Sequence, residues 1–203
     1  IVSSPENFHY VTGFGGHQHT VSRQPGFTLA VMRADDKVPT HLTTMDFEAA
    51  TFRIKAAGLN FVVDPYDTWV GLKTWDEIAH GAVVPDKTAM ESSMDKLVQF
   101  MKACDLANKK VGIELDYLPV PYYKSLTEKF PEAEFVNISD LFVYARSVKQ
   151  PDEIEMFRKL CRIADHGFTE VSKIAKIGVS ERELVQCFRE DVIKSGFCAP
   201  SSW

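Results

Sequence analysis

The strongest constraint on the fold is an alternation of short apolar runs with segments of helical spacing over the first 147 residues. Apolar runs of five or six residues are typical of strands, and apolar residues at steps of three and four are typical of helices. The expected strands are residues 1–2, 27–32, 38–43, 59–63 (a buried strand), 110–115 and 134–138. The expected helices are residues 5–12, 46–57, 86–106, 119–130 and 139–145. This order predicts an α/β layer fold.

The pattern changes after residue 147. Residues 151–177 carry apolar side chains at helical steps, and Gly178 is expected to end that long helix. A Ser-x-x-Glu capping box at residues 180–183 predicts a second helix that runs to residue 194. Residues 197–203 are expected to begin a strand. The predicted domains are residues 1–147 and residues 148–203.

Composition excludes several classes of partner. The 203 residues include 23 Lys and Arg against 28 Asp and Glu, so the net charge is −5. A nucleic-acid binder needs a basic surface, so we expect no nucleic-acid partner. No apolar run approaches the roughly 18–20 residues that span a bilayer, so we expect no membrane partner. Four scattered cysteines without a C-x-x-C pair favour a reducing, cytoplasmic location: Cys104, Cys161, Cys187 and Cys198.

Common catalytic motifs are missing from the sequence. It contains no H-E-x-x-H, no G-x-S-x-G and no P-loop, and the glycine-rich residues 13–16 follow a helix and lack the Lys-Ser/Thr that phosphate binding requires. Cys161 and Cys187 lie beside apolar stripes, so we expect them to be small core residues. Acidic residues of the last quarter are interleaved with Lys and Arg and are expected to form solvated helix faces: Asp152, Asp165, Glu170, Glu181, Glu183, Glu190 and Asp191.

Three candidate site residues, His17, His19 and Arg23, fall on an expected loop over residues 13–26. Two imidazoles at an H-x-H spacing could bind a metal, but no third ligand is near them in sequence, and two exposed loop histidines are the alternative. The planar fork of Arg23 could bind a carboxylate, or it could be a solvated charge. Trp69 and Trp75 could line a ligand surface or be partly buried structural residues.

Three strings in order resemble a known family. The first is SPENFHYVTGF at residues 4–14, which resembles the pattern S-P-x-N-x-x-Y-L-T-G-F. The second is VGIE at 111–114, followed by PEAEFV at 131–136. The third is RSVKQPDEI at 146–154, with IAD at 163–165 and GVSEREL at 178–184. Together they resemble the creatinase / Xaa-Pro aminopeptidase (prolidase-like) metallohydrolases.

The resemblance implies a mixed-sheet, creatinase-type N-terminal α/β domain over residues 1–147. Residues 148–203 would then be the first two helices of an incomplete α+β pita-bread domain. Peptidases of this family hold two divalent metals (Mn, Co or Zn) through Asp, Asp, His, Glu and Glu, whereas creatinase works without metal. Asp152, Asp165 and Asp191 lie on expected helices and follow no Gly, so no metal ligand or catalytic residue is carried over. This chain alone is expected to be inactive.

The resemblance also implies a role for the N-terminal domain. That domain is non-catalytic, packs against the partner subunit of a homodimer and lends side chains to the active-site mouth. His17, His19 and Arg23 occupy the corresponding region and are expected to lie near the substrate. The complete protein would hydrolyse a C–N bond in a proline-containing peptide or in a small guanidino or amide substrate.

An alternative is a natural short form that acts as a binding or assembly module without catalysis. Against it, the C-terminal helices would leave apolar faces at Phe157, Phe168 and Phe188 without a covering sheet. We therefore expect an incomplete piece of a cytoplasmic hydrolase.

Overall fold

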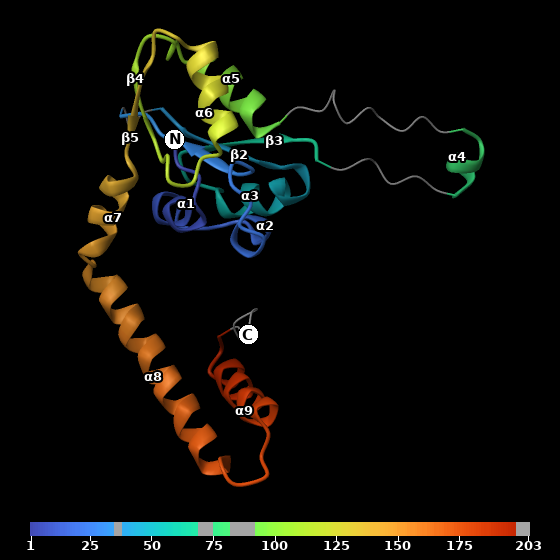
Figure 1. The fold of residues 1–203 in the computed structure, drawn as a ribbon, viewed down its shortest axis with the longest axis vertical. Coiled ribbons are helices and arrows are strands. Elements are labelled where there is room, and N and C mark those ends of the chain that lie inside the picture. Colours follow the sequence, from blue (N-terminus) through green and yellow to red (C-terminus); the bar gives the residue numbers. More distant parts are fainter. Residues whose placement is uncertain (35–37, 69–74, 82–91, 198–203) are drawn as a thin grey trace. The chain divides into compact units, whose positions relative to one another are not determined.

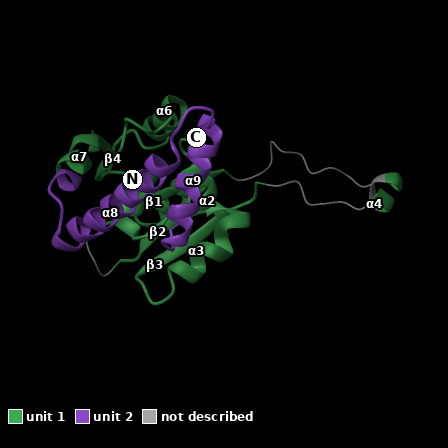
Figure 2. Ribbon diagram, turned by 90° about the horizontal axis from the view of Figure 1, so that it is seen from below, with its two compact units in different colours: residues 1–144 green, residues 145–203 purple. Residues whose placement is uncertain are grey.

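The computed structural model describes residues 1–34, 38–68, 75–81 and 92–197. The chain divides into two compact units, and Figure 2 colours them separately. Unit 1 is Ile1–Tyr144 and unit 2 is Ala145–Trp203.

Unit 1 alternates strands with helices (Figure 1). Its strands are β1 (Leu29–Val31), β2 (Thr40–Met45), β3 (Phe61–Tyr66), β4 (Lys110–Ile113) and β5 (Glu134–Asn137). Its helices are α1 (Pro5–Thr12), α2 (His17–Val21), the 3-10 turn η1 (Asp46–Glu48), α3 (Ala49–Lys55), α4 (Trp75–Ala79), α5 (Ser93–Ala103), α6 (Val120–Lys129) and α7 (Ser139–Ser147), the last of which crosses into unit 2. The predicted mixed α/β class is confirmed.

The first two residues join two groups of strands. β1 pairs antiparallel with β2, β2 pairs parallel with β3, and β4 pairs parallel with β5. Val2 exchanges backbone hydrogen bonds of 2.8 and 2.9 Å with Ala30 of β1. On its other side, the Ile1 carbonyl accepts a bond from the Glu114 N–H at 3.1 Å, just beyond β4. Hydrogen bonding therefore continues in the order β3, β2, β1, residues 1–2, β4, β5. Residues 1–2 pair like the end of a strand, as the sequence predicted.

Helices lie on both faces of the sheet, with α5 on one face and α1 and α3 on the other (Figure 1), and apolar side chains pack beneath them. On one face, Leu29 and Val31 pack with Leu97 and Met101 of α5. On the other face, the core contains Val2, Ala30, Leu42, Phe8 of α1 and Phe52 of α3. Burial of each large apolar side chain contributes roughly 1.5–3 kcal/mol, so both layers stabilise the sheet between them.

Two expectations for unit 1 were wrong. Residues 13–26 were expected to form a loop, but they contain α2. Residues 59–63 were expected to form a buried strand, but β3 starts at Phe61 and is only partly buried. It is an edge strand among the described residues, which is why Pro65 is tolerated inside it. Helix α5 begins after the Ser92 cap, and residues 86–91 of the expected helix lie outside the described residues.

Unit 2 is a helical hairpin of α8 (Pro151–Ile174) and α9 (Glu181–Lys194). The predicted Ser180–Glu183 capping box is present. Gly167 of α8 allows close packing of the two helices, because a Cβ there would lie 2.7 Å from the Phe188 ring of α9. Helix α8 ends at Ile174, before the Gly178 that was expected to stop it.

Other expectations for unit 2 were only partly met. Cys161 is exposed and Cys187 is half-buried, so the core assignment of Cys161 was wrong. Phe168 is 63% exposed, as expected for a helix face without a covering sheet. The strand expected over residues 197–203 lies outside the described residues from 198 onward. None of the helices in the described ranges combines the length and apolar character that crossing a membrane requires.

Candidate functional site

A buried carboxylate joins two distant parts of unit 1. Glu114, 4% exposed, follows β4. One of its oxygens accepts hydrogen bonds from the backbone N–H groups of Ser3 and Ser4, both at 2.8 Å, and the other accepts one from Asn7 Nδ2 at 2.6 Å. A carboxylate at a helix N-terminus is favourable because it accepts hydrogen bonds from N–H groups that have no partner within the helix, and because its negative charge interacts favourably with the helix dipole. The strings at residues 4–14 and 111–114 therefore meet around Glu114.

Other residues of these strings have local roles. Ser4 caps α1 by accepting a hydrogen bond from the Asn7 N–H at 3.2 Å. Gly13 ends α1 in the left-handed region at φ 78°, where a side chain would be strained. Gly112 of β4 leaves room for Ile138, because a Cβ at residue 112 would lie 2.7 Å from that side chain. The strings therefore hold α1 in place against the sheet.

A second buried carboxylate holds the start of α2. Glu48 Oε1 accepts a hydrogen bond from the Gln18 N–H at 2.9 Å. A Cβ at Gly16 would lie 2.5 Å from Glu48 Oε2, so the carboxylate occupies the space that any larger residue would need. The glycine-rich stretch therefore packs closely around the buried Glu48 carboxyl group.

The two histidines of the H-x-H pair lie in different environments. His17 is exposed, whereas His19 is only 2% exposed. The Nε2–H group of His19 donates to the Ser3 carbonyl at 2.8 Å, and its ring stands edge-to-face with Phe8 at 5.1 Å. Burial lowers the pKa of His19 below its ordinary value of 6.5. Side chains two positions apart on a helix are separated by roughly 200° around its axis, so His17 and His19 do not share one face of α2.

Arg23, just after α2, is held at two points. Its Nη1 and Nη2 donate to the two carboxylate oxygens of Glu6 at 2.6 and 3.3 Å, and its carbonyl accepts a bond from the Tyr117 hydroxyl at 2.7 Å. The hydrogen bond to Glu6 raises the pKa of Arg23. The backbone of Arg23 has φ 49°, an uncommon value for a residue other than glycine. The structure therefore brings Arg23 together with Glu6 and Tyr117, and not with the ring of His19.

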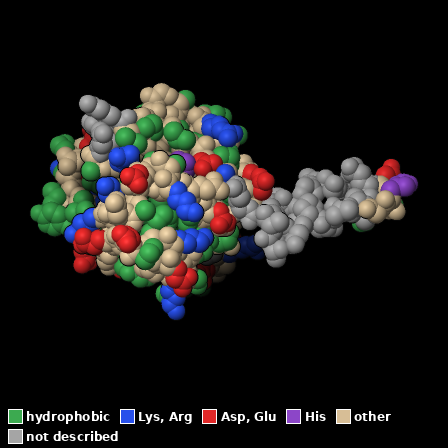
Figure 3. Space-filling model, turned by 90° about the horizontal axis from the view of Figure 1, so that it is seen from above, with side chains coloured by type: hydrophobic (Ala, Val, Ile, Leu, Met, Phe, Trp, Pro, Cys, Tyr) green, Lys and Arg blue, Asp and Glu red, His purple; other side chains and the backbone are tan. Residues whose placement is uncertain are grey.

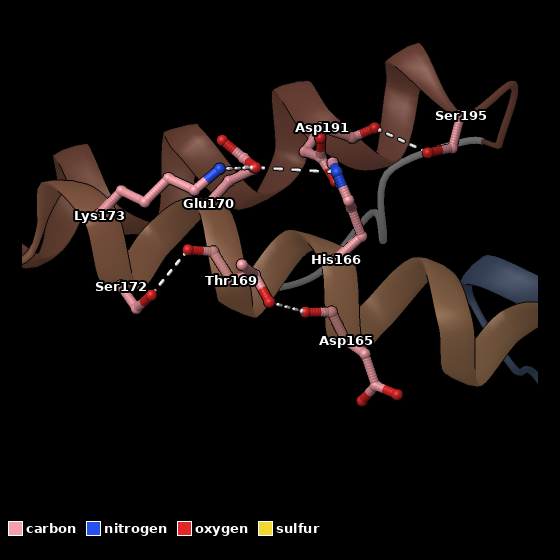
Figure 4. Close-up of polar contacts among 8 residues, drawn as sticks. All are labelled: Asp165, His166, Thr169, Glu170, Ser172, Lys173, Asp191 and Ser195. Atoms are coloured by element: carbon pink, nitrogen blue, oxygen red, sulfur yellow. Dashed lines mark hydrogen bonds and ion pairs between the residues drawn. The ribbon is translucent and has the colours of Figure 1, made fainter.

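A separate polar network lies in unit 2 (Figure 4). His166 of α8 contacts Asp191 of α9 through Nδ1 at 2.8 Å, and its Nε2 lies 3.7 Å from a carboxylate oxygen of Glu170. The hydrogen bond to Asp191 raises the pKa of His166. Asp191 was expected on a solvated face, but its side chain is only 13% exposed. The pairing joins residues 25 positions apart, which helical periodicity alone does not indicate.

The described residues provide no metal centre. They contain no group of three or more His, Cys, Asp and Glu side chains placed to hold a metal ion. The described residues therefore contain no counterpart of the five metal ligands that the resemblance implies for a two-metal peptidase. Trp75 is 86% exposed, so the alternative of a partly buried structural residue is wrong for it, and Trp69 lies outside the described residues.

One face of the molecule carries mixed charges, and unit 2 contains an apolar hollow. On the face shown in Figure 3, acidic and basic side chains are interspersed, without a broad basic patch. Between α8 and α9 lies a hollow of about 160 Å³ lined by five apolar residues, Phe168, Val171, Leu184, Val185 and Phe188. Because its lining carries no polar side chain, it has no group that could act on a substrate.

Comparison with known proteins decides the family. The family model described as the creatinase/prolidase N-terminal domain matches residues 1–148. The chain belongs to the creatinase/prolidase family. An uncharacterized hydrolase/peptidase of Sinorhizobium fredii is 25% identical over 186 residues, covering 91% of this chain and 42% of that protein. A creatinase of a Bacillus species is 28% identical over 75 residues, covering 37% of this chain and 18% of the creatinase.

Solved structures of prolidases share the fold. The Xaa-Pro dipeptidase of Bacillus anthracis matches with a TM-score of 0.61 and 20% identity, over 94% of this chain and 42% of that one. The prolidase of Thermococcus sibiricus matches with a TM-score of 0.62 and 19% identity, over 93% of this chain and 43% of that one. At such identities the likeness concerns the fold alone. The chain spans 42% of the length of its Sinorhizobium relative.

Proposed function

We propose that this chain is the N-terminal, non-catalytic portion of a hydrolase that acts on C–N bonds. The observation that carries the proposal is the match of residues 1–148 to the creatinase/prolidase N-terminal domain. The meeting of two motif strings at Glu114 supports it, because the same residues that mark the family hold α1 against the sheet. The proposed substrates are proline-containing peptides or small guanidino or amide compounds.

Within that protein, we assign residues 1–147 to the N-terminal domain and residues 148–203 to the first helices of a pita-bread catalytic domain. The N-terminal domain would serve homodimerisation and form part of the active-site mouth. His17 and Arg23 are exposed and can face a substrate, whereas the buried His19 is suited to anchoring α2. Arg23 is the residue best suited to a substrate carboxylate, because its guanidinium already holds a carboxylate through two bonds.

The complete protein would carry two divalent metals (Mn, Co or Zn) if it is a peptidase of this family. No ligand for them is assigned among the described residues, and no chemical step is placed on this chain. A cytoplasmic location is part of the proposal, since the three cysteines among the described residues, Cys104, Cys161 and Cys187, are free.

The first experiment is the intact mass of the protein from its native source, compared with the 22.9 kDa of this chain. A mass near double that value supports the proposal, and the complete protein should then hydrolyse Xaa-Pro dipeptides in a metal-dependent assay. A mass near 22.9 kDa would instead support a stand-alone binding or assembly module.

Arg23→Ala in the complete protein tests the site. We expect the KM for a carboxylate-bearing substrate to rise by about tenfold or more with kcat unchanged, because hydrogen bonds to charged groups contribute roughly 1.5–3 kcal/mol. Steady-state kinetics on an Xaa-Pro dipeptide measures both constants. An unchanged KM would remove Arg23 from the active-site mouth.

A further inference from the structure

We propose that Glu6 is an internal competitor for the Arg23 guanidinium, so that the carboxylate of a substrate must displace it, and that Tyr117 positions Arg23 for this exchange. The proposal rests on the proposed function, since it assumes that Arg23 faces the substrate. It deepens that function by assigning a free carboxylate to the substrate class and a regulating residue to the site.

The contact geometry is that of ligand recognition. Glu6 Oε1 and Oε2 accept from Arg23 Nη1 and Nη2 at 2.6 and 3.3 Å, so both arms of the fork are occupied by one carboxylate. Such two-point binding is how arginine recognises carboxylates in general. The side chains of Arg23 and Glu6 are 51% and 41% exposed, so a ligand can approach the pair from solvent.

The backbone at Arg23 is held independently of this ion pair. The Tyr117 hydroxyl donates to the Arg23 carbonyl at 2.7 Å across 94 residues of sequence. Arg23 has a left-handed φ of 49°, and among the described residues Asp105 is the other non-glycine residue with a positive φ. A residue other than glycine keeps such a conformation only where its surroundings impose it. Tyr117 therefore keeps Arg23 in place when Glu6 releases the guanidinium.

The strength of the ion pair suits an exchange. Exposed pairs are weak enough that a ligand carboxylate can replace one partner, but each displaced pair reduces the apparent affinity. Glu6 lies on the first turn of α1, which the Glu114 network fixes, so its position beside Arg23 does not depend on the ligand. Replacing Glu6 by an uncharged residue should therefore tighten binding of the substrate carboxylate. If Glu6 only supported the structure, the same replacement would weaken that binding.

The test uses the complete protein, treated with a chelator to prevent turnover, and isothermal titration with glycyl-proline and with its C-terminal amide. Glu6→Gln should lower the Kd for glycyl-proline by about 1.5- to 5-fold, as expected from removing an exposed pair. The Kd for the amide should stay unchanged. Glu134→Gln is the matched control, because it removes an exposed Lys110–Glu134 pair of 2.8 Å elsewhere in unit 1.

Two more variants complete the test. Arg23→Ala should raise the Kd for the acid and abolish the effect of Glu6→Gln in the double variant. Tyr117→Phe should weaken binding of the acid more than of the amide. The proposal is overturned if Glu6→Gln leaves or raises the Kd for the acid, changes acid and amide equally, or gives no detectable binding of the acid. The proposed function is tested separately: it fails if the metal-loaded wild-type protein does not hydrolyse the dipeptide.

Discussion

Unit 1 and unit 2 each use a titratable side chain to join segments that are far apart in sequence, but the two side chains differ in how deeply they are buried. Glu114 of unit 1 is 4% exposed and receives three hydrogen bonds from residues at the start of the chain. The His166 side chain of unit 2 is 61% exposed and joins α8 to Asp191 of α9. The hydrogen bonds of Glu114 and the His166–Asp191 contact are about equally short. Their contributions to stability should therefore differ mainly because water screens the His166–Asp191 contact.

The apolar side chains show the same difference. Phe8 of α1 is fully buried in the core that it shares with Phe52 of α3, whereas Phe168 of α8 is mostly exposed although its ring centroid lies 5.0 Å from that of Phe188. Unit 1 thus has a closed core of its own. Unit 2 is a hairpin whose apolar face remains open within the unit. The comparison leads to three predictions, in order of decreasing effect.

The largest effect should come from the closed core. Phe8→Ala should lower the free energy of unfolding by about 3–5 kcal/mol, because it removes a buried aromatic ring and leaves a cavity. Urea denaturation followed by circular dichroism measures the change. Phe168→Ala is the matched control, and its cost should be below about 1 kcal/mol. Equal losses for the two variants would contradict the distinction between a closed core and an open face.

Glu114→Ala should have the next largest effect. It leaves the N–H groups of Ser3 and Ser4 and the amide of Asn7 without their acceptor, at roughly 1–3 kcal/mol for each buried donor. We expect a total loss on the order of 3 kcal/mol in urea denaturation, and faster hydrogen exchange at the start of α1. Glu128→Ala on the exposed side of α6 is the control. A loss no greater than that of the control would show that the network contributes little.

The smallest effect concerns pH in unit 2. Because Asp191 raises the pKa of His166 in the folded state, their contact stabilises the hairpin below the ordinary pKa of 6.5 and loses that contribution as pH rises through the folded-state pKa. An NMR titration of the His166 ring should give a midpoint above 6.5 that falls in Asp191→Asn. The same midpoint in both proteins would mean that the contact does not persist in solution.

Local structure was largely predictable, because it depends on residues that are close in sequence. The Ser4 cap, the proline at the start of α1 and the capping box at residues 180–183 give the helix starts that the structure shows. The helix α2 was missed because it has five residues and no side-chain cap of its own. Its N-terminus is held by Glu48, 30 residues away, and no local pattern indicates that contact.

The candidate site shows the same division. Its three residues were selected from sequence, and they follow one another along the chain, but their environments depend on residues elsewhere. His19 is buried where it hydrogen-bonds to Ser3 and packs against Phe8. Arg23 is held by Glu6 and by Tyr117, which lies 94 residues further along the chain. Periodicity and motif spacing report which face of a segment is apolar, and they do not report which distant side chain a polar group will meet.

The sequence by itself determined the α/β class, the helix starts and the family resemblance, because these follow from local propensity, hydrophobic period and ordered motifs. Only the tertiary structure decided that residues 1–2 join β1 to β4 and that His17 is exposed whereas His19 is buried. It also decided which acidic residue holds each segment: Glu114 holds α1, Glu48 holds α2 and Glu6 holds Arg23. The physical reason is that these contacts link residues distant in sequence, and their strength depends on burial, which exists only once the chain has folded.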